Sequence, residues 1–177
     1  MHQQRVGRVV GWSDENALHV NTKKTKEIVF GSVPESHSAP ITIHGEAIEQ
    51  VGSYTYLGVI VDSLLSWKEQ TDAVCRKTKQ RIYFLRRLRS FGMSRKILLL
   101  FFTSVVMSVL QYCSTAWVGC LPETLKARLL KQLNVCSKIV GQPLMTLFDS
   151  SYKNSVLRLA RGITSNSKHP LYGEYSP

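Results

Sequence analysis

The pattern of apolar and polar positions divides the chain near Asp62. Before that residue, short apolar stretches alternate with turn-forming residues, which predicts strands and turns with a single short helical entry at 13–16. His44-Gly45-Glu46 separates two of the stretches and predicts a hairpin turn in which the glycine takes a positive φ. A Ser/Pro-rich loop is expected at 32–40. The strands are expected at 27–30, 41–43, 47–51 and 54–61.

After Asp62 the apolar residues recur at the helical spacing of about 3.6. Helices are expected at 66–90, 94–112, 122–140 and 143–161, with Gly141 as the stop of the third. The buried stripe of the first helix is predicted to comprise Trp67, Thr71, Val74, Thr78, Ile82, Leu85 and Leu88. The sequence therefore predicts an α+β fold, in which a small antiparallel β-hairpin region (1–62) precedes a mainly α-helical bundle (63–161) and a loose tail (162–177).

Positive charge is concentrated in the second part of the chain. The 177 residues carry a formal net charge of +11, yet residues 1–62 hold five basic against seven acidic side chains. Residues 76–96 hold nine basic side chains and no acid, a composition that favours a polyanionic partner over a merely solvated face. We therefore expect contact with the backbone of RNA or DNA. The candidate binding residues are Arg76, Lys79, Arg81, Tyr83, Arg86, Arg87 and Arg89.

Residues 97–122 contain no charged side chain, which is long enough for a membrane span. Because Ser, Thr and Gln interrupt the apolar run, we expect a buried helix of the bundle, with a helical interaction or membrane-associated module as an alternative. The four cysteines lack any C-x-x-C spacing and predict reduced, mostly buried thiols of an intracellular protein, in the nucleus or the cytoplasm.

Catalytic patterns are sparse. His44 and Glu46, with distant His169, match the H-x-[DE]…H arrangement of a non-haem iron site, but this spacing is permissive and we assign no metal or cofactor. The chain has no G-x-S-x-G sequence, no P-loop, no G-x-G-x-x-G sequence and no paired carboxylates at catalytic spacing. The residues present therefore support no enzyme activity.

Several short motifs follow one another in a distinctive order. The first motif comprises Trp12, Asn16, Leu18, Asn21, Lys24, Thr25 and Lys26. It is followed by Tyr56-Leu57-Gly58, and then by Trp67 and the basic stretch RIYFLRRL at 81–88. In this order they resemble the part of a LINE-type (non-LTR) retrotransposon reverse transcriptase that follows its catalytic aspartates.

The resemblance implies a remnant of the palm and a thumb-like domain. In that family the first motifs form a helix and a palm strand, so Lys24 or Lys26 would lie near the incoming nucleotide. The Tyr56-Leu57-Gly58 hairpin would support the primer end, and the basic helix would follow a template–primer duplex. The Tyr/Phe-x-Asp-Asp sequence that binds the catalytic Mg²⁺ ions is absent from this sequence, so the resemblance implies a non-catalytic remnant.

A second resemblance covers residues 76–119. This stretch, a basic helix followed by an apolar one, is similar to the N-terminal segment of the eighth AlkB homologue. That family modifies tRNA wobble uridines through a dioxygenase and a methyltransferase domain, and the similar segment belongs to neither. The second resemblance therefore implies an accessory module of an RNA-modifying protein.

Overall fold

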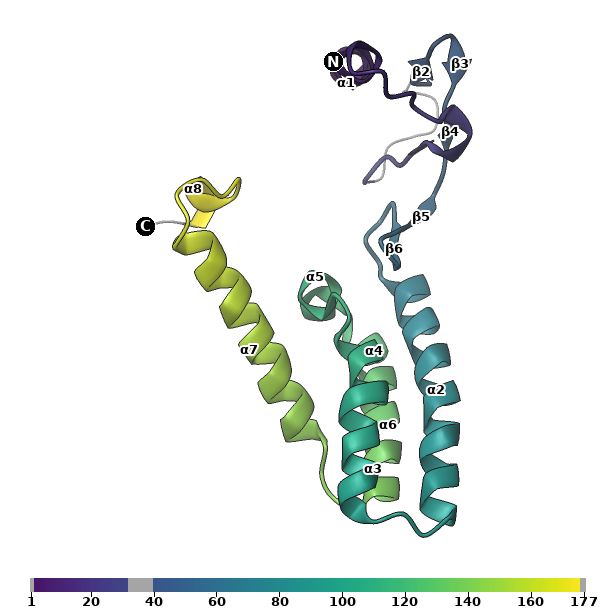
Figure 1. Cartoon of the computed structure of the whole chain (residues 1–177), viewed down its shortest axis with the longest axis vertical. Helices are drawn as coiled ribbons and strands as arrows, with labels where there is room; N and C mark the ends of the chain where they lie inside the picture. Colours follow the sequence, from purple (N-terminus) through teal and green to yellow (C-terminus); the bar gives the residue numbers. More distant parts are fainter. Residues whose placement is uncertain (1, 32–39, 176–177) are drawn as a thin grey trace. The chain divides into compact units, whose positions relative to one another are not determined.

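The computed structural model describes residues 2–31 and 40–175, so the predicted loop at 32–40 lies, apart from Pro40, outside the described residues. The chain divides into two compact units, Met1–Gln70 and Thr71–Pro177. The first carries short strands and one helix, and the second is helical (Figure 1). The predicted α+β class is therefore confirmed.

The first unit begins with a helix, α1 (His2–Glu15), where we expected strands and turns. Val6, Val10 and Ser13 are its less exposed positions, and their spacing of four and three residues was the overlooked indication of one helix face. Two glycines and three valines lower the intrinsic helix propensity of the segment and hide that pattern. The helix ends where Ala17 takes a left-handed conformation, with φ of 55°.

Two short strand pairs follow α1. Strands β2 (Thr42–Ile43) and β3 (Glu46–Ala47) form the predicted hairpin, and His44 and Gly45 both have positive φ in its two-residue turn. Strands β1 (Lys26–Glu27) and β4 (Glu49–Gln50) pair in parallel, so the expected strand at 27–30 is shorter and the expected purely antiparallel arrangement is wrong here. Gln3 joins α1 to β2, because its side-chain amide exchanges hydrogen bonds of 2.8 and 3.1 Å with the backbone of Thr42.

The strand predicted at 54–61 is in fact a hairpin of β5 (Ser53–Tyr56) and β6 (Val59–Asp62). Leu57 and Gly58 form its turn with φ of 47° and 82°. A leucine in the left-handed region is rarely the first residue of such a turn, so the alternation of side chains alone indicated a continuous strand. The hairpin that the reverse-transcriptase resemblance implied at Tyr56-Leu57-Gly58 is present.

Asp62 organises the link from β6 to the next helix. Its carboxylate accepts backbone hydrogen bonds from Leu64, Ser66 and Trp67, at 3.2, 2.9 and 3.0 Å. Leu65 and Trp67 have positive φ, of 51° and 59°, so this link contains two strained non-glycine residues. Partial burial raises the pKa of Asp62, but the hydrogen bonds from Ser66 and Trp67 outweigh that effect and lower it overall.

Helix α2 (Lys68–Ser90) starts two residues later than predicted and ends as predicted. The predicted second helix is interrupted: α3 (Arg95–Phe101) leads into a π-helical turn, η3 (Phe102–Val106), and then α4 (Met107–Gln111). Thr103 and Ser104 donate hydroxyl hydrogen bonds to the carbonyls of Leu99 and Leu100, which disturbs the regular helical hydrogen-bond ladder.

The remaining helices form the rest of the second unit. They are α5 (Ser114–Trp117), the 3₁₀ turn η4 (Val118–Cys120), α6 (Glu123–Val140), α7 (Met145–Thr164) and α8 (Tyr172–Tyr175). Gly141 ends α6 as predicted, with φ of 78°. Helix α7 runs three residues beyond 161, and α8 gives helical structure to part of the tail that we expected to be loose.

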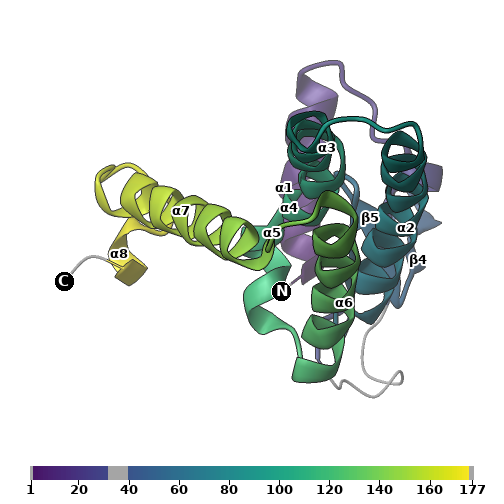
Figure 2. The same cartoon turned by 90° about the horizontal axis from the view of Figure 1, so that it is seen from below.

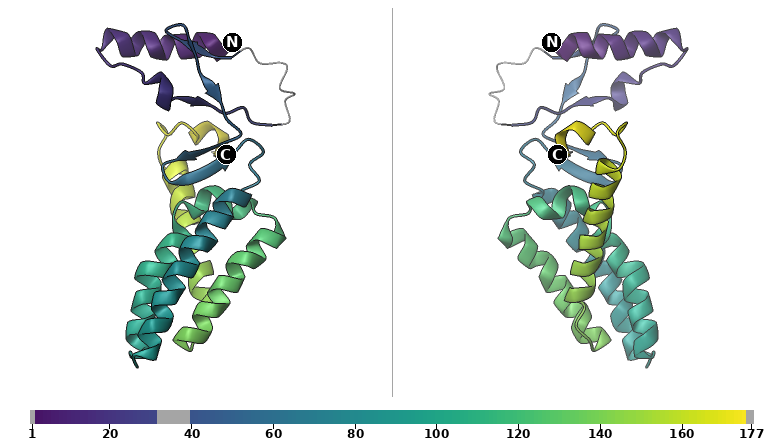
Figure 3. Two further views of the ribbon diagram at one scale, coloured as in Figure 1. Left: turned by 90° about the vertical axis from the view of Figure 1, so that its right-hand side faces the viewer. Right: turned by 90° about the vertical axis from the view of Figure 1, so that its left-hand side faces the viewer.

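The core of the second unit lies between α2, α3–α4 and α6, which run side by side in Figures 1 and 2. Helix α2 buries Val74, Ile82 and Leu85 of its predicted stripe, whereas Leu88 at its end is only half-buried. Helix α6 buries Leu129, Leu133, Cys136 and Val140. Helix α7 extends away from these three helices, as Figures 1 and 2 show, and α6 is inclined to α2 and α3 in Figure 3.

Within the described residues, no single helix is both long enough and apolar enough to cross a membrane. The segments Arg95–Gln111 and Ser114–Cys120 are long and apolar enough only when taken together, and they are bent by 41° relative to each other.

We predict that Asp62→Asn lowers the free energy of unfolding at neutral pH by about 1 kcal/mol, because the substitution removes a charged acceptor shared by three N–H groups. The pKa of Asp62 lies below its ordinary value of 3.8 in the folded chain. Its contribution is therefore fully present above about pH 4 and is lost as the pH falls through the folded pKa. Urea unfolding followed by circular dichroism between pH 2 and 7 measures both effects. Equal acid sensitivity in Asp62→Asn and the parent would contradict the prediction.

We predict that Thr78→Val raises the free energy of unfolding by about 1 kcal/mol. The Thr78 hydroxyl is fully buried and has no hydrogen-bond partner among the described residues, so removing it relieves a desolvation cost at nearly constant volume. Thr103→Val is the matched control, because that hydroxyl is exposed and hydrogen-bonded and its removal should give no gain. The urea unfolding midpoint should be higher in Thr78→Val than in the parent and should not be raised in Thr103→Val.

Candidate nucleic-acid interface

Most basic side chains of α2 lie outside its buried stripe, but Arg89 is in line with that stripe at the end of the helix. Those of Arg76, Lys79, Arg86, Arg87 and Arg89 are exposed, as is the ring of Tyr83. Arg81 is half-buried and donates a hydrogen bond of 3.3 Å to the carbonyl of Lys77. Six of the seven candidate residues are therefore exposed to solvent, and the seventh, Arg81, is hydrogen-bonded to the backbone of its own helix.

Carboxylates do not compensate this charge. In residues 2–31 and 40–175, none of the nine basic side chains at 76–96 forms an ion pair. Asp72, the acid that precedes them on α2, pairs instead with Arg128 of α6. The hydrogen bond from Arg128 to Asp72 raises the pKa of that guanidinium. In the described residues, the basic side chains at 76–89 of α2 therefore have no carboxylate partner.

Aromatic rings lie among the arginines. Tyr83 and Phe84 pack edge to face with ring centroids 5.5 Å apart, and the Arg87 guanidinium carbon lies 5.0 Å from the centroid of Phe91. Sequence reasoning missed Phe91, although it directly follows α2 and precedes Gly92, which takes the positive φ of the turn (73°). Its position after a predicted arginine-rich helix was the available indication.

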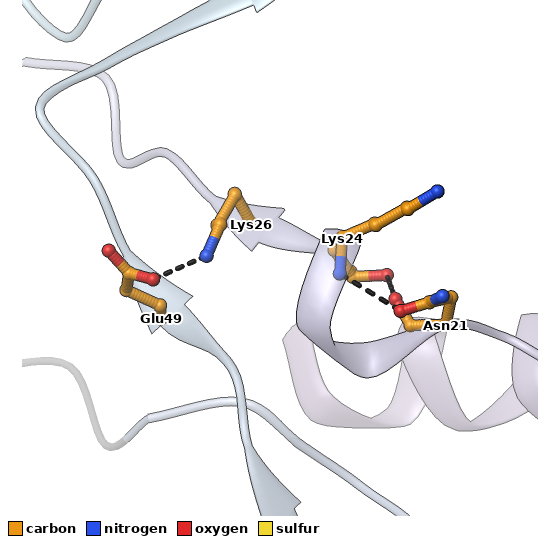
Figure 4. Close-up of polar contacts among 5 residues, drawn as sticks. Asn21, Lys24, Lys26 and Glu49 are labelled. Atoms are coloured by element: carbon orange, nitrogen blue, oxygen red, sulfur yellow. Dashed lines mark hydrogen bonds and ion pairs between the residues drawn. The ribbon is translucent and has the colours of Figure 1, made fainter.

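The two lysines suggested by the reverse-transcriptase resemblance have different environments (Figure 4). Lys24 ends the 3₁₀ turn η1 (Thr22–Lys24), where its backbone N–H donates to Asn21 Oδ1 at 3.1 Å and its side chain is exposed. Lys26 lies in β1 and forms an ion pair with Glu49, its register partner in β4. Its charge is therefore matched within the first unit.

The residues of the permissive metal motif are engaged locally. His44 Nε2 lies 3.5 Å from Asp14 Oδ1, and Glu46 accepts a hydrogen bond from Thr22. His169 Nδ1 accepts a hydrogen bond of 3.1 Å from the N–H of Leu171. Across the part of the chain that the structure describes, no group of three His, Cys, Asp or Glu side chains could hold a metal ion.

The cysteines are divided between core and surface. All four are free, but Cys113 and Cys120 are exposed, which corrects the expectation of mostly buried thiols. Burial raises the pKa of Cys75 and raises that of Cys136 to about 12, although the positive charge of nearby Arg86 opposes the second shift. The two buried thiols are therefore neutral side chains of the core.

Comparison with known proteins adds one finding at this place in the fold. Residues 67–108 match the family model described as alkylated DNA repair protein alkB homolog 8, N-terminal. We call this stretch the AlkB homologue 8 segment; it begins at Trp67 and extends through α2, α3 and η3 into α4. It starts nine residues earlier and ends eleven residues earlier than the similarity expected at 76–119.

The AlkB homologue 8 segment spans well under half of the chain, so it marks a shared segment, and that segment contains the whole basic face of α2. No curated protein and no solved structure matches the chain.

Proposed function

We propose that this chain is a non-catalytic nucleic-acid-binding module, and that the AlkB homologue 8 segment supplies its binding helix. The observation that carries the proposal is the stretch 76–96. Its nine basic residues, seven in α2 and two at the start of α3, have no acid among them in the sequence and no ion-pair partner in the described residues. The like charges of these side chains repel one another. Phosphate groups neutralise them and release counterions, which relieves the repulsion.

The family description supports a role beside a nucleic-acid-modifying enzyme. The matched family is named for an alkylated DNA repair protein, and the match covers an N-terminal region. An accessory segment of that kind would hold the RNA or DNA backbone while a separate domain performs chemistry. The module itself would need no cofactor and would act where nucleic acid is found, in the nucleus or the cytoplasm.

A remnant of a LINE-type reverse transcriptase is the second candidate. The observation that favours it is local: the β5–β6 hairpin turns at Leu57-Gly58 and leads through Trp67 into basic α2, the order that the resemblance implied. Under this candidate α2 follows a template–primer duplex, and exposed Lys24 is the palm lysine that remains available.

We predict that the triple variant R76Q/K79Q/R86Q binds a fluorescent 16-nucleotide RNA more weakly than the parent. The logarithm of the binding constant should also fall less steeply with the logarithm of salt concentration. The magnitude of that slope should drop by roughly 2, because each of three lost phosphate contacts removes about 0.7. The control K131Q/K138Q/R161Q removes the same charge from exposed positions of α6 and α7 and should keep most of the slope. Fluorescence anisotropy between 50 and 300 mM NaCl gives the slopes. Equal losses in both variants, or no binding by the parent chain at 50 mM, would overturn the proposal.

The two candidates differ in the nucleic acid that they prefer. We predict for an accessory module that a folded tRNA competes at least as well as an RNA–DNA hybrid of equal length for the labelled RNA. A polymerase remnant should instead prefer the hybrid with a recessed primer end, and Lys24→Gln should weaken that preference. Competition at fixed salt separates them, and a 2-oxoglutarate turnover assay on the same sample checks the absence of dioxygenase activity.

A further inference from the structure

A groove lies along α2 on the flank that faces α3 and η3. Its volume is about 630 Å³, and its lining includes Arg81, Phe84, Arg87, Phe91, Phe101 and Val105. The lining is mostly apolar, contains two arginines and contains no carboxylate. All of these residues belong to the AlkB homologue 8 segment. The volume is within the range of roughly 300–1,000 Å³ typical of small-ligand sites.

Two of the three phenylalanines that line this groove are exposed. Phe84 is 57% and Phe91 is 65% accessible, whereas α2 buries Val74, Ile82 and Leu85 in the core. Exposed rings gathered at a concave site indicate a partner that covers them. The two arginines restrict the chemistry of that partner, because an apolar helix seated in the groove would bury both guanidinium groups without counterions.

The rings and guanidinium groups are already arranged for stacking. Arg87 lies over the face of Phe91, and the edge-to-face contact with Tyr83 fixes the orientation of Phe84. A flat, aromatic group that is joined to a phosphate would use both components: its face stacks on a phenylalanine and its phosphate meets Arg81 or Arg87. A nucleotide with an unpaired base has this chemistry.

We propose that the groove receives an unpaired base of the strand whose phosphates lie along α2. The inference rests on the proposed nucleic-acid function and refines it, because it makes the module selective for single-stranded or locally opened nucleic acid. A base inside a regular duplex is stacked on both faces and paired along one edge, so it cannot enter the groove. The basic face then supplies affinity for single strands and duplexes alike, and the groove supplies the preference for single strands.

The test is the variant F84L/F91L, which keeps apolar side chains at both exposed positions and removes only their π faces. Its affinity for a single-stranded oligonucleotide should fall about tenfold, while its affinity for a blunt duplex stays within about twofold of the parent. The salt slope should not change, because no charge is lost. F30L/Y175L replaces two exposed aromatic residues that do not line the groove and should behave like the parent. A 2-aminopurine base in the single strand should be quenched by the parent and less by F84L/F91L.

The outcomes separate this inference from the proposed function. If the parent chain binds no nucleic acid at low salt, the proposed function fails and the groove inference fails with it. If the parent binds with a salt slope that depends on α2, but F84L/F91L binds single strands as tightly as the parent or loses single-strand and duplex affinity equally, then the groove inference alone is overturned.

Discussion

The helical unit depends on the burial of one face of α2. Leu85 and Thr78 of that helix are fully inaccessible, and Ile82 nearly so, in the core shared with α3–α4 and α6. A helix that commits one stripe to a core must expose the opposite face, and in α2 that face consists of Arg, Lys, Tyr and Phe side chains. The same packing that stabilises the unit therefore fixes the direction of its positive charge.

The electrostatic balance of the helix is asymmetric along its length. Near its start Asp72 is matched by Arg128, and Glu69 is the acid of its first turn, where a negative charge suits the helix dipole. From Arg76 onward no acid follows. The N-terminal part is thus joined to α6 by an ion pair, whereas the basic residues that follow it form no ion pair in the described residues. Exposed ion pairs contribute little to stability, so the packing of the stripe must hold the charged face in place.

Two family resemblances meet in the same residues. The AlkB homologue 8 segment and the basic helix implied by the reverse-transcriptase resemblance coincide on α2, and both imply contact with a nucleic-acid backbone. They differ in what surrounds the helix, a modifying enzyme in one case and a polymerase palm in the other. The shared part of the two interpretations is the proposed contact of α2 with a nucleic-acid backbone, which is favoured by the basic charge of that helix that has no ion-pair partner in the part of the chain that the structure describes.

The sequence alone determined the α+β class, the extent of α2 and α6, the stop at Gly141 and the basic face, because helical periodicity and glycine turns are local properties of the chain. Periodicity did not reveal α1, whose glycines and valines obscure the pattern, or the hairpin at Leu57-Gly58, which only the reverse-transcriptase resemblance implied. The groove was hidden for another reason. Phe84 and Phe91 come from α2 and its end, and Phe101 and Val105 come from the next helix, so only the packing of α3 and η3 against α2 brings them to one place. Periodicity determines which face of a helix is apolar, but tertiary packing decides which apolar side chains remain uncovered.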